Sequence, residues 1–165
     1  MRFAACCLLL TILVIGPAFQ PLHAEDTMVY AGRATSKFVN FPGLPTCTTN
    51  SVQNGDPSKG GSVILAKSAA GCTVPWHWHT PNEQLMIVSG SARVAMKDGA
   101  STALYAGDYL SLPGKHVHQF TCVAACTMFV VSDAAFDIHY VDASGKEISP
   151  DEALKSKTKR LPTKK

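Results

Sequence analysis

The sequence contains two histidines separated by one residue, a spacing that can place two imidazoles side by side for metal binding or catalysis. If His77 and His79 lie on a β-strand, both imidazoles leave the same face, because side chains alternate along a strand. The segment Thr80-Pro81-Asn82 is typical of a turn, and it would return Glu83 to the same face on the next strand. We therefore expect two imidazoles and one carboxylate to converge.

A second histidine pair, His116 and His118, has the same spacing and can reach the same point if the sheet closes into a barrel. Three imidazoles and one carboxylate suit one divalent transition metal, Fe, Mn, Ni, Cu or Zn, and leave two positions of an octahedral ion open. For the first pair alone, structural histidines would be the better interpretation. Glu83 and the second pair together favour a metal site.

The region that holds these residues has the pattern of an all-β domain. From Ser62 to Asp133, short apolar and β-branched runs are separated by Gly, Pro or Asp, which is typical of a sandwich or barrel. Residues 25–61 are predicted as N-terminal loops and edge strands, and 134–165 as a last strand, a short helix that begins after Ser149, and a basic tail. The predicted strands are 62–69, 72–79, 83–89, 91–97, 102–105, 108–112, 116–122 and 126–132.

The segment Gly71 to Gly90 resembles the first motif of the cupin family, G-x5-H-x-H-x3-E-x6-G, at every fixed position. The second motif, G-x5-P-x-G-x2-H, is similar to Gly107–His118, except that Lys115 stands where the inner glycine is usual. The resemblance implies a single antiparallel β-barrel, or double-stranded jelly roll, over 62–133 and pairing into a homodimer. It also implies turn glycines at Gly71, Gly90 and Gly107, and the metal ligands His77, His79, Glu83 and His118.

Cupins carry many chemistries on one shell, so the fold does not select the function. The first hypothesis is an oxygenase-type enzyme for a small chelating substrate, such as an enediol, catechol or flavonol, with Glu83 as the catalytic proton acceptor. Alternatives are a metal-dependent ligand-binding or sensor module of the cell envelope, and a zinc-loaded structural barrel. His116 is interpreted as a pocket-wall residue or as an acid or base next to the metal. The expected apolar pocket wall consists of Leu85, Ile87, Leu112 and Phe120.

The N-terminus predicts export. Arg2, an apolar run from Phe3 to Ile15 and the small residue Ala24 have the layout of a signal peptide over 1–24, and the run is shorter than the roughly 20 residues that span a bilayer. We expect a secreted or periplasmic protein with no stable membrane insertion after cleavage. Six of the 15 basic residues lie in the last eleven positions, so a basic nucleic-acid-binding body is not expected.

Four cysteines remain after cleavage, and in an exported chain they favour two disulfides over a thiolate zinc site. Cys122 and Cys126 bracket a three-residue hairpin loop, which favours their pairing and leaves Cys47 for Cys72. Parity along the strand points Cys72 away from the metal unless a bulge intervenes, and it does the same for Trp76 and Trp78. The two tryptophans would then pack under a covering segment or form a dimer interface.

Overall fold

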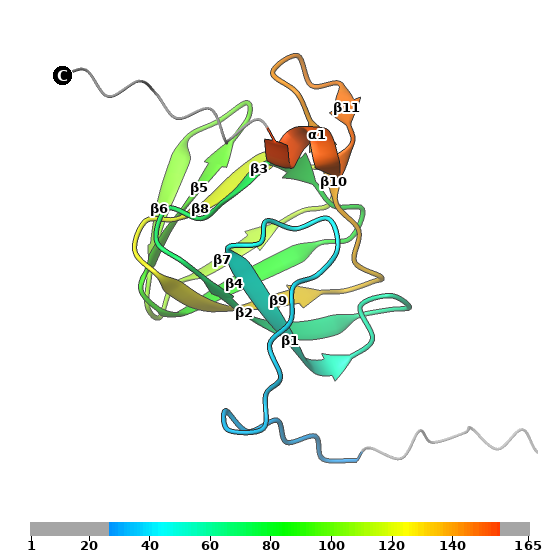
Figure 1. Ribbon diagram of the computed structural model, residues 1–165, viewed down its shortest axis with the longest axis vertical. Coiled ribbons are helices and arrows are strands. Elements are labelled where there is room, and N and C mark those ends of the chain that lie inside the picture. The colour runs from blue at the N-terminus through cyan, green and yellow to red at the C-terminus, as the bar shows by residue number, and fades with distance from the viewer. Residues whose placement is uncertain (1–26, 156–165) are drawn as a thin grey trace, which may run out of the picture.

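The computed structural model describes residues 27–155, which form two antiparallel β-sheets packed face to face (Figure 1). The predicted signal peptide and residues 156–165 of the predicted basic tail lie outside the described residues. Within 27–155, no helix has the length and apolar content needed to cross a membrane. The predicted all-β jelly roll with a short C-terminal helix is confirmed.

The first sheet has the strand order β1-β2-β9-β4-β7. Its strands are β1 (Thr48–Gly55), β2 (Ser62–Ser68), β9 (Cys126–Ser132), β4 (Glu83–Ser89) and β7 (Tyr109–Leu112). The second sheet has the order β11-β10-β3-β8-β5-β6. Its strands are β11 (Glu147–Ile148), β10 (His139–Val141), β3 (Thr73–Trp78), β8 (His118–Cys122), β5 (Ser91–Met96) and β6 (Ser101–Tyr105).

The apolar core lies between the two sheets because alternate residues of both sheets point inward. It includes Leu85 and Ile87 of β4, Val94 of β5 and Phe120 of β8, all at most 6% exposed. Strand alternation therefore both fills the core and sets which polar side chains enter the interior.

The expected strands from 62 onward are found with ends that agree within two residues. Strand β1 is longer than the short edge strands expected for residues 25–61. Its length was not evident from the sequence because its Thr-Thr-Asn-Ser-Val run places polar rather than apolar side chains on the inner face. The helix α1 (Pro150–Lys155) begins as predicted, with the Ser149 hydroxyl accepting a hydrogen bond from the Glu152 amide at 3.2 Å.

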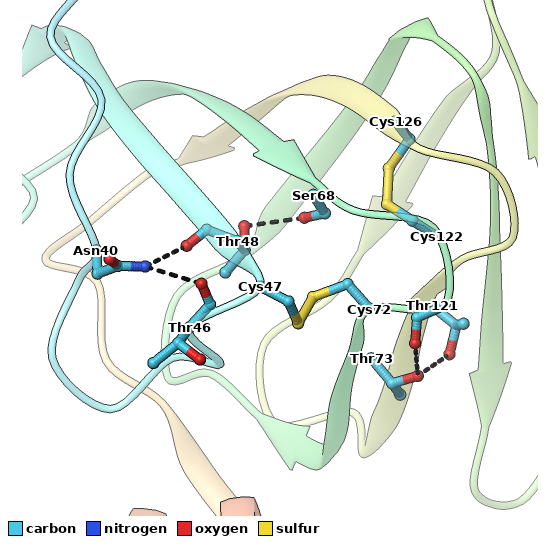
Figure 2. Close-up of a disulfide and its surroundings, with 11 residues drawn as sticks. Asn40, Thr46, Cys47, Thr48, Ser68, Cys72, Thr73, Thr121, Cys122 and Cys126 are labelled. Atoms are coloured by element: carbon cyan, nitrogen blue, oxygen red, sulfur yellow. Dashed lines mark hydrogen bonds between the residues drawn. A yellow bond between two sulfur atoms is a disulfide. The ribbon is translucent and has the colours of Figure 1, made fainter.

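Both predicted disulfides, Cys47–Cys72 and Cys122–Cys126, are present, and each joins one sheet to the other (Figure 2). The first ties the start of β1 to the start of β3, and the second ties the end of β8 to the start of β9. Their position closes one end of the sandwich and leaves the histidine-bearing ends of β3 and β8 at the other end. Disulfides persist in oxidising compartments, so the pair suggests an extracytoplasmic environment.

Candidate metal centre

Three buried imidazoles meet at the open end of the sandwich. His77 is the second-last residue of β3, His79 follows that strand directly, and His118 is the first residue of the neighbouring strand β8. All three are at most 4% exposed, and each offers a ring nitrogen within 4.8 Å of the others. The predicted convergence of the first pair with one member of the second is therefore present.

Each imidazole is held by a main-chain carbonyl group on its Nδ1 side. His77 Nδ1 lies 2.6 Å from the Pro75 oxygen, His118 Nδ1 lies 2.9 Å from the His116 oxygen, and His79 Nδ1 contacts the Asp137 oxygen. A carbonyl oxygen only accepts hydrogen bonds, so each Nδ1 must carry the proton. The Nε2 lone pair of each neutral ring is then free for a ligand, which is the usual arrangement of metal-binding histidines.

The carboxylate of Glu83 completes the cluster from the facing sheet. It begins β4, is 9% exposed, and places its oxygens 3.4 Å from His118 Nε2 and 3.8 Å from His79 Nε2. A metal cation placed between these oxygen and nitrogen atoms would attract the lone pairs of both. Because His79 Nε2 is buried and has no hydrogen-bond partner among the described residues, a cation at this point would satisfy it.

The electrostatics of the cluster favour a neutral His77 imidazole and a charged Glu83 carboxylate. Burial lowers the pKa of His77 well below its usual value, and the charges of His118 and His79 lower it further. Burial raises the pKa of Glu83, but the hydrogen bond with His118 and the charges of His79 and His118 outweigh burial, so the net shift is downward. Three imidazole nitrogens and one carboxylate fit a divalent transition ion.

A β-bulge in β3 changes which side chains face this cluster. Val74 pairs with Phe120 and His77 pairs with His118, so three steps along β3 match two along β8. Val74 and His77 consequently line the same cavity despite their opposite parity. The expectation for Cys72 held only without a bulge, and with the bulge Cys72 has the parity of Val74 and lies buried, 5% exposed, in its disulfide with Cys47.

The two tryptophans are partly exposed and do not line the cavity, as strand parity predicts. Trp78 stacks on the ring of His139 in β10, with centroids 3.9 Å apart and planes 6° apart. This contact agrees with packing against a neighbouring segment. The dimer interface stays a prediction.

His116 does not enter the cavity. Strand β8 begins at His118 rather than at residue 116, so His116 lies in the preceding turn with its side chain exposed. The expectation that the two residues share one strand face is wrong, and His116 contributes its carbonyl oxygen instead. In the same turn Lys115 has a positive φ of 65°, the conformation for which glycine is usual.

A cavity of about 60 Å³ extends inward from the imidazoles. Leu85 and Phe120 line it as expected, whereas Ile87 and Leu112 belong to the core behind it. Sequence reasoning missed the contributions of loops and of β1, which carry no motif. These lining residues are Phe41, Leu44, Thr48, Asn50, Phe136 and Ile138.

The comparisons with known proteins agree with this architecture. Residues 65–132 match the family model of the cupin domain. The chain therefore contains a cupin domain over these residues. A search of curated proteins found no significant sequence match.

Several solved structures share the fold at low sequence identity. The polyketide cyclase RemF from Streptomyces resistomycificus is 18% identical, with a TM-score of 0.66 over 82% of this chain and 95% of that chain. A protein assigned as an acetylacetone dioxygenase from Methylibium petroleiphilum is 14% identical, with a TM-score of 0.59 over 78% and 90% of the two chains. KdgF from Halomonas sp. is 14% identical, with a TM-score of 0.52 over 65% and 94%. At these identities the likeness concerns the fold alone.

Proposed function

We propose that this protein is an extracytoplasmic metal-binding cupin with oxygenase-type activity on a small chelating oxygen compound, such as an enediol, catechol or flavonol. The observation that carries the proposal is the set of three buried imidazoles whose Nδ1 atoms are all tied to carbonyl groups. That arrangement directs three Nε2 lone pairs to one point beside the Glu83 carboxylate.

His77, His79, His118 and Glu83 would hold the metal. A bound divalent transition ion would supply Lewis acidity, open coordination positions and, for Fe, Mn, Ni or Cu, redox chemistry. The Glu83 carboxylate lines the cavity, where it would accept a proton from a substrate hydroxyl. Leu85 and Phe120, together with the other apolar lining residues, exclude water and favour a ligand with an apolar body.

Both disulfides support the extracytoplasmic location, because each must form in an oxidising compartment. Among the fold relatives, one is assigned as a dioxygenase and another is a cyclase, so the shell itself is compatible with more than one chemistry. The binding-module hypothesis uses the same metal site without turnover. Pairing of two copies through the face that carries Trp76 and Trp78 remains a prediction.

The test is elemental analysis of untagged protein, purified from an oxidising compartment without chelator, together with His77→Ala and His118→Ala. We expect about one transition-metal ion per chain in the wild type and less than a tenth of that in either variant. His116→Ala is the matched control, because the His116 side chain is exposed and only its main-chain carbonyl contacts the site. Equal metal content in all four proteins would refute the proposed site.

Oxygen uptake with enediols, catechols and flavonols then tests turnover. Glu83→Gln should keep the fold and lower the rate, because the amide cannot accept the substrate proton. Saturable ligand binding without oxygen uptake or product would overturn the enzyme proposal in favour of the binding module.

A further inference from the structure

The side-chain amide of Asn50 is a second buried polar group in the lining of the cavity. Asn50 lies in β1 and is 4% exposed, and its Nδ2 atom is buried without a hydrogen-bond partner in the described part of the chain. Of the three buried side-chain atoms in this condition, two, His79 Nε2 and Asn50 Nδ2, belong to residues that line the same cavity. An unpaired buried amide is costly, so a fold retains one chiefly where something binds it.

The position of Asn50 is set firmly by its main chain. The main-chain N–H of Asn50 donates to the Val39 carbonyl at 2.8 Å, and the main-chain carbonyl of Asn50 accepts from the Val39 N–H at 2.9 Å. Strand β2 pairs with the other side of β1. The adjacent hydroxyls behave differently, because Ser68 donates to Thr48 at 2.9 Å and thereby gives both groups a partner. Among the polar residues of β1 that line the cavity, Asn50 is thus the one whose side chain can still donate a hydrogen bond to a ligand.

Asn50 also lies deeper than the imidazoles. The Cys47–Cys72 disulfide joins the starts of β1 and β3, which run in the same direction from the closed end. Asn50 follows Cys47 by three residues, and His77 follows Cys72 by five. At roughly 3.3 Å per residue, His77 is several ångströms nearer the open end, on the facing sheet.

We propose that Asn50 is a specificity-determining donor for the inner end of the ligand. The proposal rests on the metal-binding function above and names the ligand class more closely. The ligand carries chelating oxygens at one end, a short apolar body, and a carbonyl or hydroxyl oxygen at the other end that accepts a hydrogen bond from Asn50 Nδ2. The apolar lining between the two polar ends, which includes Val74 and Leu85, matches that body.

The test compares two hydroxamates that bind without turnover, measured by calorimetry on Zn²⁺-loaded protein. Pentanohydroxamate has an apolar tail, whereas 4-oxopentanohydroxamate has a carbonyl in the tail, too far from the chelating head to alter it. The wild type should bind the carbonyl compound about tenfold more tightly, which corresponds to one well-made buried hydrogen bond. Asn50→Leu should abolish this preference and leave binding of pentanohydroxamate intact.

Thr48→Val is the matched control, because it removes a polar group from the same strand and the same cavity whose hydrogen bond is already satisfied. It should keep the tenfold preference. Equal binding of both hydroxamates to the wild type would overturn the role of Asn50 and leave the metal site standing. Failure of the wild type to bind zinc or either hydroxamate would overturn the metal-binding function, and with it this inference.

A second measurement does not depend on the metal. In protein stripped with chelator, Asn50→Leu should raise the melting temperature by about 3 °C, because an unpaired buried amide is replaced by an apolar group of similar size. A clear fall in the melting temperature would show that the amide stabilises the fold, and would refute its assignment to ligand binding.

Discussion

Loss of the Cys47–Cys72 disulfide should destabilise the protein strongly, because the bridge closes a long loop. The two cysteines are 25 residues apart, and the loop-closure entropy for that separation corresponds to about 3.5 kcal/mol at 25 °C. For a domain of this size, the loss is equivalent to a fall of roughly 13 °C in the melting temperature. The effect arises in the unfolded chain, which becomes freer when the bridge is absent.

Urea unfolding of Cys47→Ala/Cys72→Ala, followed by the fluorescence of Trp76 and Trp78, measures this energy. Cys47→Ala alone is the control, because Cys47 is exposed and its side chain adds little packing. The single variant must lose nearly the same free energy as the double variant, since either change removes the bridge. A loss below about 1 kcal/mol in both would refute the loop-entropy reasoning.

The double variant also tests whether metal binding and the ligand preference set by Asn50 depend on different parts of the fold. His77 and His118 are held by carbonyl groups in or next to β3 and β8, and His79 by that of Asp137 before β10, so metal content should be unchanged in Cys47→Ala/Cys72→Ala. Strand β1, which carries Asn50, loses its covalent link to β3, so the preference for the carbonyl hydroxamate should weaken. Loss of the metal with the bridge would contradict this division.

Three further changes test the turn beside the site and one buried phenol. Lys115→Gly should stabilise the fold by about 0.5–1 kcal/mol in urea unfolding, because glycine relieves the cost of the positive φ. Gly114→Ala should destabilise it by about 2 kcal/mol, since the new Cβ would meet the Thr80 carbonyl oxygen. Burial raises the pKa of Tyr140 above the usual value near 10, so its contribution to stability is full below pH 10 and is lost as the pH rises further. Tyr140→Phe should remove this part of the alkaline decline, measured by urea unfolding from pH 9 to 11.

Local sequence signals were sufficient for the barrel strands and for the candidate ligands. Alternation with period two puts His77 and His79 on one face, and the segment 80–82 leads to Glu83, which approaches them from the facing sheet rather than from the same face. The short loop between Cys122 and Cys126 favoured the observed cysteine pairing, although this loop crosses from one sheet to the other and is not the expected hairpin. These features depend on residues near one another in the chain, so side-chain type and spacing carry the information.

Other features were decided by contacts between distant segments. The bulge that brings Val74 to the same side as His77 depends on the register with β8. The carbonyl group that holds His79 belongs to Asp137, 58 residues away, and a main-chain oxygen has no signature in the sequence. The same holds for Asn50, whose strand reads as polar and irregular until pairing with β2 turns its amide inward. Sequence alone therefore determined the candidate donor residues, through local periodicity. Tertiary structure decided which ring nitrogen carries the proton and the shape and polarity of the cavity, because these arise where remote backbone segments meet.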